Sequence, residues 1–336
     1  MINVGFIGAG EIADTHAAAI DLVASARLAA VTDLDLSRAK ALAARHGATV
    51  AEDVATLLRA SGLDVVYILT PPAAHMEQIM AVAEAGIPIM CEKPLTVTLA
   101  EAERAIGYAR ERQVPVMTGL THRYHPLAAE VRSMIQAGEF GDFVAAWSHR
   151  LIHLPVRPNS WLNDLSAAGG LTLQYAMHDL DWAMSVGGNV VEVTAQQYRA
   201  DEALNIEDNL WALLRFDNGG SGSLGASWSA AQAHAERGVV GTRGNLRIVE
   251  QKHLIGAFHD GRVVNRHLGD DYDWFDVFVR ESQDVIDCVR RGDTFTITGE
   301  DGRRALELSV ATLHAAQQVR PVSLPLPATF SMEELP

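Results

Sequence analysis

The 336-residue sequence has little cysteine, little positive charge and no long apolar segment. Its 27 basic and 42 acidic residues give a formal net charge of −15, which argues against nucleic acid or an anionic membrane as a partner. No apolar run reaches the length that a bilayer span needs. The two cysteines, Cys91 and Cys288, lie far apart in apolar segments, so we expect buried thiols in a reducing compartment.

Two further signals are missing, a targeting segment and a metal cluster. The N-terminus begins with an expected strand and shows no basic region, apolar region or cleavage site of a secretory signal, so we expect a cytoplasmic protein. His122 and His125 are three residues apart, but no third ligand follows at a familiar spacing. No metal site is therefore predicted.

The composition, with 48% apolar and 21% charged residues, is that of an ordinary globular protein long enough for two domains. Strand and helix patterns alternate from Met1 to about Gly119, which indicates a doubly wound parallel sheet. The helices are predicted at Ile12–Val23, Ser37–His46, Val54–Ala60, His75–Ala85 and Leu99–Arg112. We assign residues 1–120 to the first of these domains.

Residues 121–336 follow a different pattern, with hairpin-like turns such as Asp260-Gly261 between short strands. This pattern predicts an α+β domain with a large, mainly antiparallel, open-faced sheet. Strands are expected at Phe143–Ile152, Val190–Tyr198, Asn209–Phe216, Gly222–Ser229, Gly238–Val240, Asn245–Glu250, Leu254–His259 and Val263–Leu268. Helices at Leu173–Ser185, Trp274–Arg291 and Gly302–Gln318 would cover one face. The other face is a natural subunit interface, so we expect a homodimer or homotetramer.

The first turn of the chain carries a GxGxxA pattern between an apolar strand and a helix. Gly8 permits a tight turn, Gly10 lets backbone amides approach a pyrophosphate, and the small Ala13 lets helix pack on strand. The pyrophosphate would sit at the helix N-terminus, where free N–H groups favour anions. Glu11 and Ile12 open that helix and are predicted to contact the cofactor.

Asp33 ends the next apolar strand, 23 positions after Gly10, where a dinucleotide fingerprint places the acid that binds the adenosine ribose. A carboxylate there repels a 2′-phosphate and the neighbouring Leu34 offers nothing to bind one. We therefore predict NAD rather than NADP, with Arg38 as the nearby residue that leaves room for NADP. The alternative for Asp33 is a loop carboxylate or helix cap.

Two segments carry residues suited to chemistry. Lys93, within Glu92-Lys93-Pro94, ends a strand at the ligand-facing edge and could contact a substrate oxygen, or be a surface lysine in a turn. His178 lies in a helix expected after Gly169-Gly170, where Gln174 and Asp181 would share its face. Histidine is a natural proton acceptor near neutral pH, although this one could instead structure the helix start.

Taken together, these motifs resemble the Gfo/Idh/MocA oxidoreductases, the family of glucose–fructose oxidoreductase and inositol dehydrogenase. The resemblance covers essentially the whole chain. It rests on the GxGxxA turn, Thr70-Pro71-Pro72 with His75, Glu92-Lys93-Pro94, His122-Arg123-Tyr124-His125-Pro126, the Gly169-Gly170 to His178-x-x-Asp181 segment, and Thr298-Gly299-Glu300-Asp301-Gly302.

The resemblance implies a dinucleotide-binding Rossmann domain at residues 1–120, followed by a substrate-binding and oligomerisation domain at residues 121–336. It also implies NAD(P) and oxidation of a hydroxyl on a sugar, cyclitol or related polyol. Carried over, Lys93 contacts the reacting hydroxyl, His178 transfers its proton, and Asp181 occupies the acidic position one turn later. Arg123, Tyr124 and Gln174 would bind other hydroxyls, although Arg123 could be a helix-start ion pair. The cofactor-binding set is Gly8, Gly10, Glu11, Ile12, Asp33, Thr70, Pro71, His75, Glu92 and Lys93.

The sequence departs from the family pattern at one informative position. Gln174 stands where many family dehydrogenases have aspartate, and Ala176 where glycine is frequent. Because glutamine does not ionise, an NAD-dependent, redox-neutral glycosidase stays open as a rival function. A non-enzymatic NAD-sensing regulator is a second rival, because a regulator with a similar fold exists. Intact Lys93 and His178 count against the regulator.

Overall fold

The computed structural model describes residues 1–59, 62–327 and 330, and its contacts divide the chain into two compact units. The first unit comprises Met1–Tyr124 and Trp274–Arg304, and the second comprises His125–Asp273 and Ala305–Pro336. Within the described ranges, no helix has both the length and the apolar character to cross a membrane.

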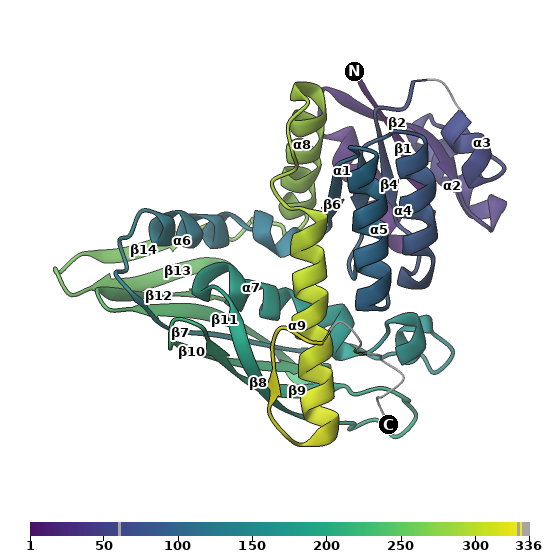
Figure 1. Ribbon diagram of the computed structural model, residues 1–336. Helices are drawn as coiled ribbons and strands as arrows, with labels where there is room; N and C mark the ends of the chain where they lie inside the picture. Colours follow the sequence, from purple (N-terminus) through teal and green to yellow (C-terminus); the bar gives the residue numbers. More distant parts are fainter. Residues whose placement is uncertain (60–61, 328–329, 331–336) are drawn as a thin grey trace. The chain divides into compact units, whose positions relative to one another are not determined.

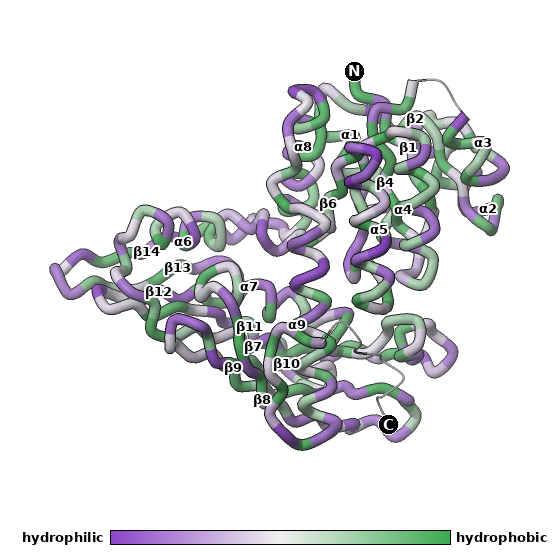
Figure 2. Tube along the Cα trace, viewed as in Figure 1, coloured by the Kyte–Doolittle hydropathy of each residue, from purple (hydrophilic) through white to green (hydrophobic). Residues whose placement is uncertain are grey.

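The first unit contains a parallel sheet, as predicted from its continuous apolar runs (Figure 1). Its strands, as far as the chain is described, are β1 (Ile2–Ile7), β2 (Ala26–Thr32), β3 (Thr49–Val50), β4 (Val65–Ile68), β5 (Ile89–Cys91) and β6 (Val116–Thr118), in the order β3-β2-β1-β4-β5-β6. Figure 2 shows β1 and β4 as hydrophobic segments, and Phe6 and Tyr67 on them are fully buried. The strand order reverses between β1 and β4, which is where such sheets bind dinucleotides.

The helices of the first unit begin and end close to the predicted residues. They are α1 (Glu11–Asp21), α2 (Leu36–His46), α3 (Val54–Arg59), α4 (His75–Glu84), α5 (Leu99–Glu111) and α8 (Asp276–Arg291), with 3₁₀ turns at Pro72–Ala74 and Thr121–Tyr124. Ala60, the predicted end of the third helix, lies outside the described residues. One assignment was wrong: α8 does not cover the second sheet but belongs to the first unit, where it contacts α1. There Phe278 packs edge-on against the His16 ring, with centroids 5.4 Å apart.

The second unit contains a mixed sheet that is mostly antiparallel, as predicted. Within the described part of the chain its strands are β7 (Phe143–His153), β8 (Val190–Tyr198), β9 (Asn209–Phe216), β10 (Ser221–Ser227), β11 (Ser229–Gly241), β12 (Gly244–Val249), β13 (His253–Phe258), β14 (Val263–His267) and β15 (Val322–Ser323). Their order is β14-β13-β12-β11-β7-β10-β9-β8-β15, and β7 and β10 run parallel. β11 is far longer than the predicted Gly238–Val240.

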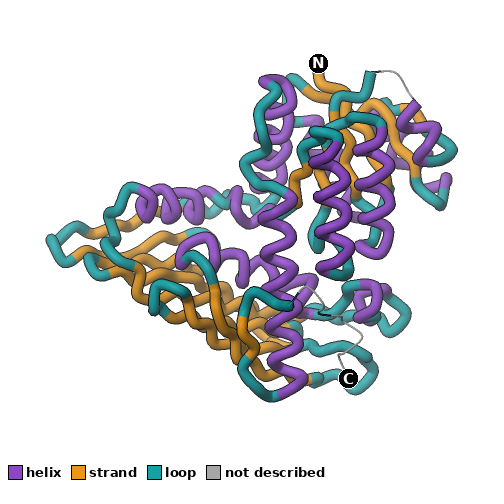
Figure 3. The backbone as a smooth tube through the Cα atoms, in the orientation of Figure 1, coloured by secondary structure: helices purple, strands orange, loops and turns teal. Residues whose placement is uncertain are grey.

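Helices cover one face of this second sheet, as Figure 3 shows. They are α6 (Pro126–Gln136), α7 (Met177–Gly187) and the part of α9 (Gly299–Gln318) that belongs to the second unit. Short 3₁₀ turns lie at Trp161–Asn163 and Leu165–Ala167, and a π-helix, Thr172–Ala176, directly precedes α7. Leu180 of α7, Leu210 and Phe216 of β9, and Leu308 of α9 share one buried cluster between helices and sheet.

Candidate active site

The two glycines of the first turn differ in what surrounds them. Gly8 has φ +106°, and a Cβ there would lie 2.8 Å from the carbonyl carbon and oxygen of Leu69, so no side chain fits. Its N–H donates to the Thr32 carbonyl at 2.8 Å. Gly10 has φ −83°, and a Cβ there would meet no atom within 4 Å. Gly8 is therefore required by the fold, whereas Gly10 leaves open space at the start of α1.

Asp33, at the end of β2, forms a side-chain hydrogen bond with the main chain of the glycine turn. Its Oδ2 accepts the Ala9 N–H at 2.7 Å, and its Oδ1 accepts the Asp35 N–H at 2.8 Å. A carboxylate offers about four acceptor positions, so capacity remains for ribose hydroxyls. These features fit a dinucleotide. The open space over Gly10, at the N-terminus of α1, suits the pyrophosphate, and Asp33 at the neighbouring strand end suits the ribose.

His75 connects the segment after β4 with the segment after β5, because its ring contacts a main-chain carbonyl of each. Its ring is fully buried, with Nε2 2.7 Å from the Thr70 carbonyl oxygen and Nδ1 3.0 Å from the Pro94 carbonyl oxygen. Burial lowers the pKa of His75, against the opposing effect of these two carbonyls. The Thr70 hydroxyl donates to Gln78 at 2.6 Å. The contacts of His75 therefore fix the shape of the edge, and a direct contact with cofactor stays a prediction.

Glu92 is a buried carboxylate beside the predicted catalytic lysine. Its Oε1 lies 2.9 Å from His16 Nε2, and its Oε2 accepts the Lys93 N–H at 3.0 Å. Burial acts to raise the pKa of Glu92, but the hydrogen bond and charge of His16, with Lys93, outweigh it and lower the pKa. Glu92 thus stays ionised and fixes the main chain of Lys93, whose peptide bond to Pro94 is cis.

Glu281, on α8, is a second buried carboxyl in this unit and was not singled out from the sequence. It is fully buried, and its Oε2 accepts a long hydrogen bond of 3.5 Å from the Thr121 hydroxyl. Burial, reinforced by the charge of Glu92, raises its pKa well above the ordinary value of 4.5. The pKa values of the two carboxyls are thus shifted in opposite directions: that of Glu92 is lowered, which favours its charged form, and that of Glu281 is raised, which favours its neutral form.

The raised pKa of Glu281 predicts a pH-dependent gain in stability for Glu281→Gln. In the unfolded chain Glu281 ionises above its ordinary pKa, whereas in the folded chain its raised pKa favours the neutral acid, so its contribution to stability falls as pH rises. Glutamine copies the neutral acid at every pH. We expect thermal unfolding of variant and wild type to coincide near pH 4 and to separate by about 1–3 kcal/mol at pH 8, in favour of the variant.

The matched control is Glu103→Gln, an exposed glutamate on α5, which should change unfolding little at either pH. Equal unfolding temperatures for wild type and Glu281→Gln at pH 8 would contradict a protonated Glu281.

Arg123 and Tyr124, predicted to bind substrate hydroxyls, make structural contacts within the first unit. Arg123 Nη1 donates to Asp301 Oδ1 at 3.0 Å, the helix-start ion pair that was the alternative interpretation. The Tyr124 hydroxyl donates to Asp284 at 2.7 Å, and burial, together with the negative charge of Asp284, raises its pKa. Their roles toward substrate stay predictions.

In the second unit, Gly169 and Gly170 lie where the surrounding atoms and the local backbone conformation leave no room for a side chain. A Cβ on Gly169 would lie 2.5–2.7 Å from carbonyl oxygens of the 161–164 turn, and Gly170 has φ +91°. Glu207, whose pKa burial raises, faces Gly170 and accepts the Thr172 N–H at 2.7 Å. The glycine pair thus has a structural explanation, whereas the sequence suggested close approach to a ligand.

The helix expected from Leu173 begins as a π-helix and becomes α-helical at Met177. Gln174 lies in the π-helical part, and its Nε2 donates to the Ala168 carbonyl at 2.6 Å. His178 and Asp181 lie in the first turns of α7 with exposures of 8% and 1%. A π-helical insertion is rare and often marks a functional segment.

Asp179, beside His178, forms a buried ion pair that sequence reasoning missed. Arg150 of β7 donates through Nε to both carboxylate oxygens, at 2.8 and 3.0 Å, and the Ser148 hydroxyl donates to Asp179 at 2.6 Å. Arg150 also donates through Nη2 to the Tyr175 carbonyl at 2.7 Å. Arg150 lies on an expected strand with nothing in its local sequence to mark its partner.

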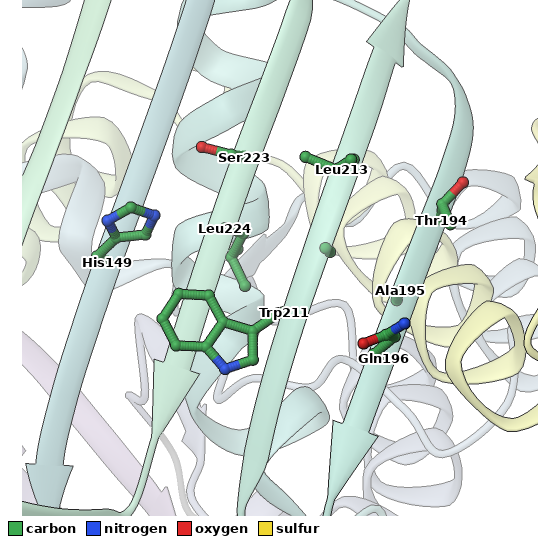
Figure 4. Close-up of a pocket in the computed structure, with 9 residues that line it drawn as sticks. His149, Thr194, Ala195, Gln196, Trp211, Leu213, Ser223 and Leu224 are labelled. Atoms are coloured by element: carbon green, nitrogen blue, oxygen red, sulfur yellow. The ribbon is translucent and has the colours of Figure 1, made fainter.

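The face of the second sheet opposite α6 and α7 carries a shallow apolar pocket of about 280 Å³ (Figure 4). Trp211 and Leu213 of β9 are 50% and 64% exposed there. The Trp211 ring lies over Gly225, where a Cβ would collide with it, and 5.7 Å from the His149 ring. Large apolar side chains gathered on an open sheet face are typical of a protein interface.

Comparison with known proteins gives consistent results along the chain. Residues 2–120 match an oxidoreductase family described by its NAD-binding Rossmann fold, and residues 128–247 match the Gfo/Idh/MocA C-terminal domain. The scyllo-inositol 2-dehydrogenase (NAD+) of Bacillus subtilis is 26% identical over 98% of both chains. The myo-inositol dehydrogenase Hyg17 of Streptomyces leeuwenhoekii is 31% identical over 73% of this chain and 76% of its own.

Solved structures show the same fold. A levoglucosan dehydrogenase in complex with NADH and L-sorbose superposes with a TM-score of 0.89 over 97% of this chain and 99% of its own, at 22% identity. Within the described residues no group of three histidine, cysteine, aspartate or glutamate side chains is arranged to hold a metal ion.

Proposed function

This chain belongs to the Gfo/Idh/MocA family of oxidoreductases, with an NAD-binding Rossmann domain, and from that premise we propose that it oxidises a hydroxyl of a sugar, cyclitol or related polyol, or reduces the corresponding ketone. The observation that supports a redox function is the geometry of the first turn. A Cβ on Gly10 would meet only open space, and Asp33 is held beside the turn by a hydrogen bond from the Ala9 N–H. The substrate class is supported by relatives of 26% and 31% identity that are named inositol dehydrogenases.

In the proposed mechanism, this chain's residues bind the substrate and handle the proton. When bound, NAD supplies the hydride acceptor. The His178 imidazole accepts the proton of the reacting hydroxyl, and the Lys93 ammonium stabilises the negative charge that develops on its oxygen. Ionised Glu92 holds the Lys93 main chain. Gln174 and Asp181 are proposed to bind neighbouring hydroxyls, with Arg123 and Tyr124 as further candidates.

A substrate screen with NAD tests this proposal. Inositols, aldoses and sugar acids are offered, and NADH is followed by its absorbance; formation of NADH with a polyol is the expected result. Release of sugar from a glycoside without net NADH would instead identify a redox-neutral glycosidase. Calorimetric NAD binding without turnover of any compound would favour an NAD-sensing regulator.

A preference for NAD over NADP is predicted from Asp33. The carboxylate repels a 2′-phosphate, and the nearby cation Arg38 is paired with Asp35, 3.5 Å away. We expect kcat/KM to favour NAD, and Asp33→Asn to reduce the preference about tenfold, which corresponds to about 1.4 kcal/mol. Asp21→Asn, at the exposed C-terminal end of α1, is the matched control and should leave the preference unchanged; a wild type that prefers NADP would refute the assignment.

We further propose that the open face of the second sheet joins copies of this chain in a homodimer or homotetramer. Leu213→Glu places a charge on that face and should reduce the molar mass measured by light scattering. Leu22→Glu is the control, because Leu22 is equally exposed, at 64%, but lies at the end of α1. A monomeric wild type, or an unchanged mass for Leu213→Glu, would contradict this interface. A cytoplasmic location stays a prediction.

A further inference from the structure

We propose that Arg150 is a positioning residue, which holds the π-helical turn before His178 in the geometry that the proposed reaction needs. This inference rests on the proposed function. One guanidinium binds on both sides of His178: to the Tyr175 carbonyl three residues before it, at 2.7 Å, and to the Asp179 carboxylate immediately after it, at 2.8 and 3.0 Å. Arg150 is 5% exposed and Asp179 is fully buried.

The contacts of Arg150 require the shape of arginine as well as its charge. The guanidinium carbon lies 3.8 Å from the centre of the Tyr175 ring, so the group stacks on that ring while it donates to the Tyr175 carbonyl and to Asp179. A planar guanidinium presents several N–H donors in fixed directions, whereas a lysine ammonium is a compact charge. Lysine at position 150 would keep the charge and lose the stacked, forked arrangement.

The π-helical turn is the part of this segment that needs outside support. Thr172–Ala176 breaks the regular hydrogen-bond ladder of an α-helix, and such interruptions persist where surrounding groups satisfy the displaced carbonyls. Arg150 donates to one carbonyl of this stretch. A return to α-helical bonding would rotate Gln174 relative to His178 and separate two side chains that are proposed to contact one substrate.

The surroundings of Asp179 allow the role of Arg150 to be tested by substitution, because another cation and a hydrogen-bond donor remain near the Asp179 carboxylate. Arg237 of β11 is also 5% exposed, and burial, with the charges of Arg150 and Arg132, lowers its pKa to about 10, which leaves it a cation at neutral pH. Ser148 donates to Asp179 at 2.6 Å. In Arg150→Lys the buried carboxylate therefore keeps a neighbouring cation and a hydrogen-bond donor.

The experiment compares Arg150→Lys with Arg215→Lys. Arg215 lies on β9 of the same sheet, exposed and paired with Glu192 at 3.3 Å, so it controls for an arginine-to-lysine change. We measure kcat and KM for the polyol that wild type turns over, NAD affinity by calorimetry, and amide hydrogen exchange across Thr172–His178. Arg150→Lys should lower kcat about 10- to 100-fold, leave NAD affinity within about twofold, and speed exchange in that segment. The control should change none of these.

Two results would overturn the proposal: wild-type kcat in Arg150→Lys, even with faster exchange, or a lower kcat with unchanged exchange. If wild type turns over no polyol, the proposed function fails, and exchange alone decides whether Arg150 holds the π-helical turn. The same measurements on Asp179→Asn, which keeps the side-chain shape and weakens the contact, decide the question if Arg150→Lys does not fold.

Discussion

Replacing His178 with alanine is expected to lower kcat by roughly 10²- to 10⁴-fold, the usual contribution of one positioned general base. The imidazole is proposed to take the hydroxyl proton, and alanine leaves that proton without an acceptor. Calorimetric NAD affinity should stay close to wild type, because the residues that fit the dinucleotide belong to the first unit and His178 to the second.

His259→Ala is the matched control for this measurement. His259 belongs to the same unit but is exposed after β13, and its removal should leave kcat unchanged. A His178→Ala enzyme that retains wild-type turnover would remove His178 from the mechanism. A loss of NAD affinity of the same size as the loss of kcat would show that the histidine serves cofactor binding instead.

The second large effect is a contrast between two alanine substitutions two residues apart. Gly8→Ala should lower the free energy of unfolding by about 3 kcal/mol or more, because φ +106° is strained for alanine and the new methyl group meets the Leu69 carbonyl. Gly10→Ala should change stability by less than about 0.5 kcal/mol, because its φ of −83° suits alanine and no atom lies within 4 Å.

The Gly10→Ala variant should show its effect in NAD affinity and not in stability. At Gly10 the methyl group projects into the space proposed for the pyrophosphate, so we expect a loss of NAD affinity of at least about tenfold in a fully folded protein. Denaturant unfolding and calorimetry on both variants check the contrast. Normal NAD binding by Gly10→Ala would place the pyrophosphate elsewhere, and wild-type stability of Gly8→Ala would contradict the packing described for β1 and β4.

The sequence predicted the first sheet well for a physical reason. Strands buried on both faces read as uninterrupted apolar runs, as Val65–Ile68 does, and the glycine turn has a local signature. β11 was mostly missed because residues 229–237 are rich in alanine and polar side chains, and pairing with β7 makes them a strand. The amphipathic pattern of α8 predicted a helix but not its partner, which is α1 and not the second sheet.

The residues of the candidate site also fall into two groups: those that local sequence patterns predicted and those that only the fold brings together. Gly8, Gly10 and Asp33 were found because their chemistry depends on spacing within one strand–turn–helix unit. Contacts between distant residues left no such pattern: Arg150 and Asp179 are 29 positions apart, and Thr121 and Glu281 are 160 apart. Sequence patterns report short-range geometry, whereas burial and charge pairing between distant positions are decided by the fold.

The interrupted first unit has a consequence for biosynthesis. Its Rossmann strands are translated first, but α8 is separated from them by the 149 residues of the other unit, His125–Asp273, and leaves the ribosome much later. Until then His16 lacks the Phe278 ring and Thr121 lacks Glu281. A nascent or truncated chain ending near Tyr124 therefore exposes the α1 surface to chaperones, and a minimal nucleotide-binding fragment needs α8 grafted back onto it.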